Sequence, residues 1–504
     1  MSVILGLQDG HDGSVCIVKD GKLIVAVGSE RVTRIKKDSA WNDDVIQYCL
    51  EAANMTMDDI DHIVQADNKK SLWGNELALK TPSKPIMGSS EPIHTISHHT
   101  AHAAASYYLS PFNDAWVFTL DSSWGDARAN SSICFGRGNK IDWIECPLGY
   151  EPRDRMEFVG CIYSATTEKL GLGNAIYKAG TTMGLACYGR NPVNYKEKDW
   201  FNFKAKEISS EPTEYWAEDF QDKADIALEC QQLFENTVLN VLGKMDLTSS
   251  KNLCLGGGSM LNCTLNGKIV KQTDFEDYHI FPACGDDGLS VGAAFYYAHH
   301  VLDEPRVHHD WKDQCYTGRD YISNGEPDYK KIAQLLAEGN VIGWFNGKSE
   351  FGPRALGNRS ILADPRTYHM RERINHHIKN REWFRPFAPV VLEEEADKWF
   401  DFDIASPFML YTAQVKKPGE IQAVTHVDNS ARLQTVDEPT NPHYYRLIKA
   451  FQEETGVPVL LNTSLNENGQ PIVETPEQAL EFLKRGKLNY MVIGDIILKA
   501  NNYE

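Results

Sequence analysis

Residues 3–27 read VILGLQDGHDGSVCIVKDGKLIVAV, and this stretch decides the fold at the beginning of the chain. Its apolar runs are separated by two polar, glycine-containing segments, DGHDGS (9–14) and KDGK (19–22). Short apolar runs bounded by Gly and Asp are typical of β-strands, and an Asp-Gly pair between two such runs is typical of a hairpin. The stretch therefore predicts three strands, with a glycine-rich loop after the first and a hairpin turn after the second.

Beyond this stretch, helix and strand patterns alternate along the chain, which predicts an α/β protein. We expect helices at 43–53, from residue 98 to near Pro111, and at 328–338, and strands at 115–121, 251–256 and 340–345. A buried strand, a polar loop and a capped helix are expected within 457–480. We interpret 301–327 as a linker, so the prediction is a first domain at 1–320 and a second at 328–504.

The composition is that of a globular protein without membrane spans. The chain has 504 residues, 42% of them hydrophobic, and 51 Lys and Arg against 70 Asp and Glu give a net charge of −19. That charge disfavours non-specific binding to nucleic acid or anionic lipid, although a local basic patch could serve either. Eleven cysteines without a C-x-x-C motif suit a reducing compartment. We expect a cytoplasmic protein, because no apolar run approaches about 20 residues and no basic leader precedes one.

Two histidines and two aspartates are candidate metal ligands. His98 and His102 stand four residues apart on a predicted helix and therefore project from one face. Asp121 ends a predicted strand and Asp286 lies in a Gly-Asp-Asp-Gly turn, so both could add carboxylates. Such a set suits iron(II), manganese or zinc better than magnesium. Capping or core packing of the histidines is the alternative, His99 competes as a partner of His102, and sequence spacing alone does not bring the four together.

Other histidines are weaker candidates. His11, in the first loop, could act as a general base toward an alcohol, although a histidine in a turn is more often simply exposed to solvent. Adjacent histidines point apart along a helix or strand, so we interpret three pairs as surface or linker residues: His299-His300, His308-His309 and His376-His377.

A glycine triplet is a candidate nucleotide site. Gly256, Gly257 and Gly258 separate a predicted strand from a helix that begins near Asn262. Backbone at such a junction can approach a nucleotide closely, with helix N–H groups nearby. The triplet matches neither a Walker loop nor a dinucleotide fingerprint, and a tight turn is the alternative explanation.

The most unusual string is GWFNGKSEFGPRALGNRSILADPR, residues 343–366. It carries Lys348, Arg354 and Arg359 on a segment punctuated by Gly and Pro. Between residues 348 and 385, nine Lys and Arg oppose only four Asp and Glu. We favour a pocket for phosphate or carboxylate over a solvated basic face. Ser464, in the string NTSLN that ends a later strand, could complete that pocket.

Three motifs carry a resemblance that spans essentially the whole chain: HHTAHAA (98–104), LCLGGGSMLNCTLNGK (253–268) and, most specifically, EFGPRALGNRSILADPR (350–366). In this order they resemble the O-carbamoyltransferase family, which includes nodulation protein U and enzymes acting on tobramycin, cephamycins and novobiocin. The resemblance implies an N-terminal actin-like, ribonuclease-H-like domain and a C-terminal YrdC-like domain. The chain departs from the family pattern at residues 122–125, at Ser259 and at Leu465.

The resemblance also implies a reaction and its residues. In the family, the carbamoyl group of carbamoyl phosphate is activated with ATP as carbamoyl-adenylate in the YrdC-like domain. It then passes to an acceptor hydroxyl in the actin-like domain, beside an iron-type metal; Mg²⁺ is a candidate companion of ATP. The implied roles are metal ligation by His98, His102, Asp121 and Asp286, base catalysis by His11, nucleotide binding by Gly256, Gly257, Gly258 and Asn262, and binding of carbamoyl phosphate or the adenylate by Lys348, Arg354, Arg359 and Ser464.

Several questions stay open at this point. The acceptor could be a secondary metabolite, a sugar or a nucleoside, or a hydroxymethylated pyrimidine in DNA if that base were flipped out. The net charge favours a small molecule. A non-catalytic nucleotide-binding scaffold and a metal-dependent hydrolase that needs no ATP are hypotheses of other classes. A homodimer is compatible with the sequence.

Overall fold

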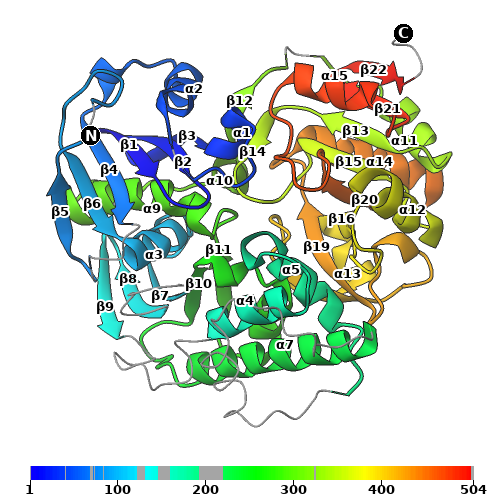
Figure 1. The fold of residues 1–504 in the computed structure, drawn as a ribbon, viewed down its shortest axis with the longest axis horizontal. Helices are drawn as coiled ribbons and strands as arrows, with labels where there is room; N and C mark the ends of the chain where they lie inside the picture. Colours follow the sequence, from blue (N-terminus) through cyan, green and yellow to red (C-terminus); the bar gives the residue numbers. More distant parts are fainter. Residues whose placement is uncertain are drawn as a thin grey trace.

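The computed structural model of the chain describes residues 2–39, 41–67, 72, 74–82, 85–121, 131–145, 159–191, 220–322 and 325–500. The N-terminal strands lie on the left of Figure 1 and the C-terminal sheet on the right, with helices from the middle of the chain below. Sheets covered by helices in both parts confirm the expected α/β class.

The first sheet is built from the stretch that opens the chain. Its strand order is β3 (Lys22–Gly28), β2 (Ser14–Lys19), β1 (Val3–Gln8), β4 (His62–Asp67), β6 (Ile93–Ser97) and β5 (Leu77–Lys80). Strands β1, β2 and β3 are antiparallel neighbours, whereas β4 and β6 run parallel to β1. Asp20 and Gly21 have φ of 53° and 73°, the two left-handed residues of a tight hairpin. The predicted three strands are confirmed.

The second sheet repeats this topology. Its order is β9 (Lys140–Glu145), β8 (Ser131–Arg137), β7 (Asp114–Leu120), β10 (Asn252–Gly256) and β11 (Asp277–Ile280). Strands β7, β8 and β9 are antiparallel neighbours, and β10 and β11 run parallel to β7. A three-stranded meander followed by two parallel strands thus occurs twice, which is the duplicated architecture of the actin-like fold.

Two buried helices join the sheets. Helix α9 (Leu289–Phe295) packs on β1, β2 and β4 of the first sheet, while α3 (His98–Tyr108) packs on β7 and β10 of the second. The helices also contact each other (Figure 1), and every residue of both is buried. They approach so closely that a Cβ on Gly292 would lie 1.9 Å from the carbonyl oxygen of Ala101. Small residues at this crossing therefore set the distance between the two sheets.

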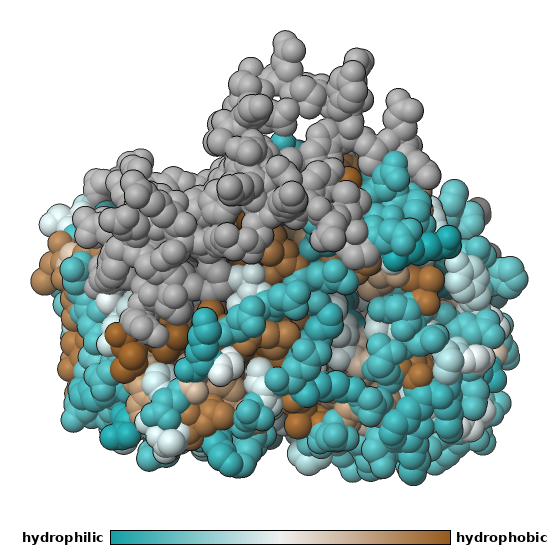
Figure 2. All heavy atoms as spheres, turned by 90° about the horizontal axis from the view of Figure 1, so that it is seen from below, coloured by the Kyte–Doolittle hydropathy of each residue, from teal (hydrophilic) through white to brown (hydrophobic). Residues whose placement is uncertain are grey.

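The remaining helices of the N-terminal part cover the outer faces. Helix α2 (Asp43–Ala53), confirmed with the predicted bounds, packs on β2 and β3 next to α1 (Ser29–Thr33). Helices α4 (Val159–Lys169), α5 (Ala175–Ala186) and α7 (Phe220–Leu242) pack on one another, and α7 contacts α8 (Cys263–Gln272). Figure 2 views the molecule from their side and shows a hydrophilic band crossing the described part of this face.

The C-terminal part is a nine-stranded mixed sheet with helices packed against it. Its order is β17 (Phe400–Asp401), β18 (Tyr411–Val415), β19 (Ser430–Val436), β16 (Ala388–Leu392), β20 (Val459–Ser464), β15 (Arg359–Ala363), β13 (Ile342–Phe345), β21 (Tyr490–Ile493) and β22 (Ile496–Lys499). Its helices are α11 (Tyr329–Ala337), α12 (Tyr368–Arg373), α13 (Ala396–Trp399), α14 (Pro442–Thr455) and α15 (Pro476–Lys484). The predicted helix near 328–338 is confirmed as α11, with Asp328 capping it, and the predicted strand is β13. The YrdC-like identity of this part stays a prediction.

The interpretation of residues 301–327 as a linker is wrong. This segment contains α10 (Trp311–Cys315) and β12 (Tyr316–Asp320), and β12 pairs with β14 (Lys348–Glu350). Arg306 donates hydrogen bonds to backbone carbonyls at the end of α3, including that of Tyr107 at 2.9 Å. Polar residues that look solvated in the sequence thus satisfy buried backbone groups here. Residues 323 and 324, within the expected linker, lie outside the described residues.

Two of the paired histidines are not at the surface. His299 is fully buried, and its Nδ1 lies 2.9 Å from the carbonyl oxygen of Glu304. His309 is also buried, and its Nε2 accepts a hydrogen bond of 3.2 Å from the backbone of Leu23. The surface interpretation is therefore wrong for these two, because each ring satisfies a backbone group inside the protein.

Candidate active site

The four predicted metal ligands converge between the two sheets of the N-terminal part. His98 and His102 lie in the first turns of α3, Asp121 directly follows β7, and Asp286 opens the turn before α9. All four are buried, and one ligand atom from each lies within 4.8 Å of the others. His98 Nε2 is 3.2 Å from Asp121 Oδ2, and His102 Nε2 is 3.4 Å from Asp286 Oδ1.

This cluster has the chemistry of a cation site. In the described part of the chain, His102 Nε2 and Asp286 Oδ1 are buried and have no hydrogen-bond partner. Burial acts to raise the pKa of Asp286, but His98, His102 and His11 together outweigh it, and the pKa falls to about 2. An ionised, buried carboxylate facing an imidazole nitrogen needs positive charge nearby. The residues present therefore fit a divalent cation held by two nitrogens and two oxygens.

The competing histidine is directed elsewhere. His99 Nδ1 lies 3.2 Å from Thr119 Oγ1, on β7. It does not belong to the group whose ligand atoms converge. The histidines that face the carboxylates are therefore His98 and His102, spaced i and i+4, and not His99 and His102, spaced i and i+3.

His11 lies at the edge of this cluster. Its Nε2 is 3.4 Å from Asp286 Oδ2, and its Nδ1 is 3.1 Å from Asp12 Oδ2. Lys37 Nζ donates a 2.6 Å hydrogen bond to the same Asp12 oxygen. The hydrogen bond to Asp12 raises the pKa of His11 to about 9, with Asp286 adding to the effect. The ring is therefore protonated at neutral pH without a cation beside it.

The glycine triplet has packing reasons for lacking side chains. A Cβ on Gly256 would lie 2.9 Å from the His102 carbonyl oxygen, and Gly257 has φ of +91°. A Cβ on Gly258 would lie 3.1 Å from Asp121 Oδ1. Asn262 caps α8 by accepting a 3.0 Å hydrogen bond from the backbone of Leu265. These contacts hold β10 against the metal cluster, and nucleotide binding by the triplet stays a prediction.

A group of arginines lies in the C-terminal part. Arg354, in the loop between β14 and β15, has a buried Nε without a hydrogen-bond partner among the residues described, and so does Arg432 of β19. Burial, together with the nearby charges of Arg354 and Arg385, lowers the pKa of Arg432 to about 9. The acidic residue that contacts Arg385 is Glu382, at 3.6 Å. Incompletely neutralised guanidinium groups in a buried place favour an anion.

The other predicted anion ligands lie in different surroundings. Ser464 Oγ lies 3.1 Å from Nζ of Lys379, a buried lysine. Arg359 is fully buried, and its guanidinium donates to the carbonyls of Asn346 and Gly347 at 2.7 and 3.1 Å. Lys348 is exposed on β14. The structure thus places Arg354 in the arginine group and Ser464 beside Lys379, but Arg359 among backbone carbonyls.

Sequence reasoning did not single out three of these basic residues. Lys379 and Arg385 belong to the excess of positive charge noted between 348 and 385, so a signal for them existed. Arg432 has none, because it stands alone in an otherwise ordinary strand sequence, SARLQTV.

The arginine group and the metal cluster share a wall. The loop before Arg354 packs against the turn that carries Asp286, so closely that a Cβ on Gly352 would lie 2.9 Å from the carbonyl oxygen of Pro282. The negative charge of Asp287, next to Asp286, acts to raise the pKa of Arg354.

The positions at which the chain departs from the family pattern lie in different places. Residues 122–125 lie outside the described residues, Leu465 is buried, and Ser259 lies in the 3-10 turn Gly258–Leu261.

No helix in the described ranges combines the length and apolar character needed to cross a bilayer.

Comparison with known proteins assigns the chain to a protein family. Residues 3–77 and 67–295 match the family domain described as Carbamoyltransferase N-terminus, and residues 333–500 match Carbamoyltransferase C-terminus. Nodulation protein NolNO of Sinorhizobium fredii is 33% identical over 97% of this chain and 79% of its own length. The 3'-hydroxymethylcephem-O-carbamoyltransferase of Amycolatopsis lactamdurans is 27% identical over 98% of each chain. With both family domains present in order, the chain belongs to the carbamoyltransferase family and is an enzyme of carbamoyl transfer.

Proposed function

We propose that this enzyme transfers the carbamoyl group of carbamoyl phosphate to an acceptor hydroxyl in two stages, each in its own part of the chain. The first stage uses ATP in the part that we assign to residues 328–504. The second uses the metal cluster and His11 in the part that we assign to residues 1–320. The observation that carries the proposal is the contact between the two sites: the loop that carries Arg354 packs against the segment just before Asp286, and Asp286 belongs to the buried cation site.

In the first stage, carbamoyl phosphate gives carbamate and phosphate by hydrolysis. A carbamate oxygen then attacks the α-phosphorus of ATP, which forms carbamoyl-adenylate and releases pyrophosphate. Arg354, Arg385 and Arg432 would hold the phosphate oxygens, because these arginines are partly buried and their charges are incompletely neutralised. Lys379 and Ser464 would orient the carbamoyl end through the contact that they already make.

In the second stage, the acceptor oxygen attacks the carbamoyl carbon and the bond to AMP breaks. His11 would take the hydroxyl proton on its imidazole, and Asp12 would stabilise the imidazolium that results. Bound at His98, His102, Asp121 and Asp286, a divalent cation would supply positive charge that polarises the leaving group and favours neutral His11. Iron(II) is our first candidate, with manganese and zinc as alternatives.

The test is to incubate the protein with carbamoyl phosphate, ATP and iron(II), and to measure pyrophosphate release and labelled carbamoyl-adenylate. Release of pyrophosphate that depends on carbamoyl phosphate is the expected result. Nucleotide binding without turnover would favour a scaffold instead, and phosphate release without ATP as the only activity would favour a hydrolase.

A further inference from the structure

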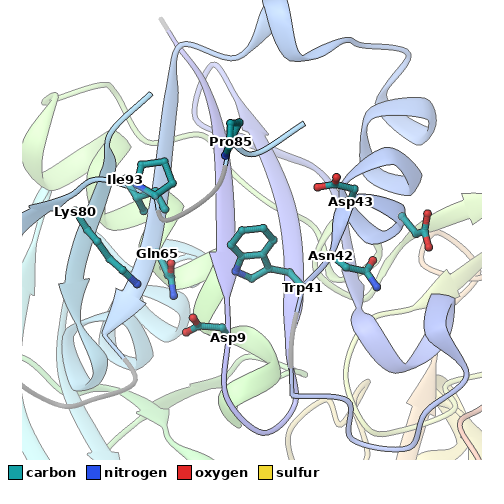
Figure 3. A pocket seen from close by; sticks show the side chains of 10 residues that line it. Asp9, Trp41, Asn42, Asp43, Gln65, Lys80, Pro85 and Ile93 are labelled. Atoms are coloured by element: carbon teal, nitrogen blue, oxygen red, sulfur yellow. The ribbon is translucent and has the colours of Figure 1, made fainter. Parts of the chain in front are cut away.

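A second group of metal-ligating side chains lies where α5 meets the C-terminal part. Cys187 directly follows α5, and His426 and Asp428 lie in the turn before β19. One ligand atom from each of the three lies within 4.8 Å of the others. The group shares no residue with the His98 cluster, nor with the lining of a pocket of about 630 Å³ beside the first sheet (Figure 3). Neither of those places accounts for the convergence of these three side chains.

Hydrogen bonds fix the turn that carries two of the three residues. The backbone N–H of His426 donates to the carbonyl of Ser430 at 2.9 Å, and that of Asn429 donates to the carbonyl of His426 at 3.0 Å. The backbone N–H and the hydroxyl of Ser430 both donate to Asp428 Oδ1, at 3.0 and 2.7 Å. The carboxylate is thus oriented before a ligand binds, which lowers the entropy cost of binding.

One nitrogen of the histidine has no partner. His426 is 6% exposed, and its Nε2 is buried without a hydrogen-bond partner among the residues that the structure describes. Nδ1 accepts a 2.8 Å hydrogen bond from the backbone N–H of Val427, so the neutral ring carries its proton on Nε2. A buried donor without an acceptor is costly. A cation at Nε2 would remove this cost: the ring proton moves to Nδ1, and the N–H of Val427, an exposed residue, bonds to water instead.

The three types of ligand favour zinc. Thiolate, imidazole and carboxylate all bind zinc in proteins, and three of them with one open position make a tetrahedral site. The Cys187 thiol donates a weak 3.8 Å hydrogen bond to the carbonyl of Met183, which a zinc–sulfur bond would replace as the thiol proton leaves to solvent. Burial and the nearby charge of Asp428 raise the pKa of Cys187 well above its ordinary value, so the thiol is not activated as a nucleophile. Asp428 is exposed, which lets water reach the fourth position.

We propose that Cys187, His426 and Asp428 form a second metal site, which binds zinc and leaves its fourth position to water. Zinc there would join α5, in the part assigned to residues 1–320, to the turn before β19, in the part assigned to residues 328–504. The sulfur ligand distinguishes this site from the His98 cluster, whose ligands are nitrogen and oxygen.

The site borders the arginine group. Tyr188, the residue after Cys187, receives a 3.1 Å hydrogen bond from Arg371. Arg371 also donates to the carbonyl of Phe384, next to Arg385, at 3.0 Å. Zinc would therefore hold the end of α5 against the segment that carries Arg385. The inference concerns metal binding and does not depend on the proposed function.

Cobalt(II) tests the assignment, because it occupies tetrahedral zinc sites and gives a near-ultraviolet charge-transfer band when a thiolate binds it. The metal-free, full-length protein is titrated with cobalt(II), and zinc is then added in competition. We expect the band in the parent and in His102→Ala, which lacks a ligand of the other cluster, and its loss when zinc is added. Cys187→Ser should abolish the band, and Asp428→Asn should weaken cobalt binding at this site about tenfold. Asp58→Asn and His308→Gln, which change exposed residues elsewhere, are the matched controls and should leave the band unchanged.

A parent protein without the band, or a band that survives Cys187→Ser, would overturn the assignment. Because Asp428 is exposed, Asp428→Asn keeps the test decisive even where Cys187→Ser does not fold, and an unchanged cobalt affinity in that variant would count against the three-residue site. Thermal unfolding gives a second measurement. Zinc should raise the unfolding midpoint of His102→Ala but not that of His102→Ala combined with Asp428→Asn at the same zinc concentration, and equal shifts in the two proteins would contradict the proposal.

Discussion

Replacing Arg432 by Met should stabilise the protein and, at the same time, slow the first stage of the reaction. Arg432 Nε is buried without a hydrogen-bond partner among the described residues, and its pKa is lowered to about 9 by burial and by the charges of Arg354 and Arg385. Replacing buried charged groups by apolar residues of similar size stabilises proteins by about 1–4 kcal/mol in favourable cases. We expect a gain in that range for Arg432→Met in the absence of ligands.

The same change should weaken the handling of phosphate. A hydrogen bond from a charged donor contributes roughly 1.5–3 kcal/mol, which corresponds to a loss of about 10- to 150-fold in pyrophosphate release. The assays are chemical denaturation in a phosphate-free buffer and pyrophosphate release from ATP with carbamoyl phosphate. Arg446→Met, which removes an arginine paired with Glu326 and Glu438 at the surface, should change stability by less than about 0.5 kcal/mol and leave release intact. An Arg432→Met protein that is less stable than the parent, or that releases pyrophosphate at the parent's rate, would refute the reasoning.

Three further predictions concern the N-terminal part and its coupling to the arginines. His102→Ala should lose bound metal and acceptor carbamoylation while pyrophosphate release continues, whereas Arg354→Ala should do the reverse; both variants failing at the same stage would contradict two separate stages. Gly292→Ala should cost roughly 1–3 kcal/mol in denaturant, because its Cβ would lie 1.9 Å from a backbone oxygen of α3, while Gly180→Ala in α5, where nothing lies within 4 Å, should be neutral or stabilising. The metal-free protein should lose stability as pH rises from about 6.5, the ordinary pKa of histidine, to about 9, the raised pKa of His11 in the folded state. The contacts of His11 with Asp12 and Asp286 stabilise its protonated form, which is lost over this range. His11→Gln should remove that dependence, and an unchanged pH profile would contradict it.

Local secondary structure could be predicted from the sequence, whereas contacts between residues far apart in the chain mostly could not. Strands β1 to β3 and helix α2 follow from apolar runs, turn residues and caps that lie within a few residues of one another. The i, i+4 spacing of His98 and His102 put both on one face, but only the packing of α3 against β7 brings Asp121 to them. Arg432 could not be recognised, because nothing in its strand distinguishes a buried cation from an ordinary polar position. The prediction of a linker at 301–327 was wrong because its polar residues looked solvated in the sequence. Arg306 and His309 instead form hydrogen bonds with backbone groups inside the protein.

The repeated strand order makes Asp9 and Asp121 counterparts. Each aspartate directly follows the first strand of its own meander, β1 in one sheet and β7 in the other. One faces the cation cluster and the other the pocket of Figure 3. An ancestral duplication that supplied two equivalent acids would have left one at the cation site and the other able to acquire a separate role. Changes around Asp9 could then accumulate through evolution without disturbing the residues that surround Asp121.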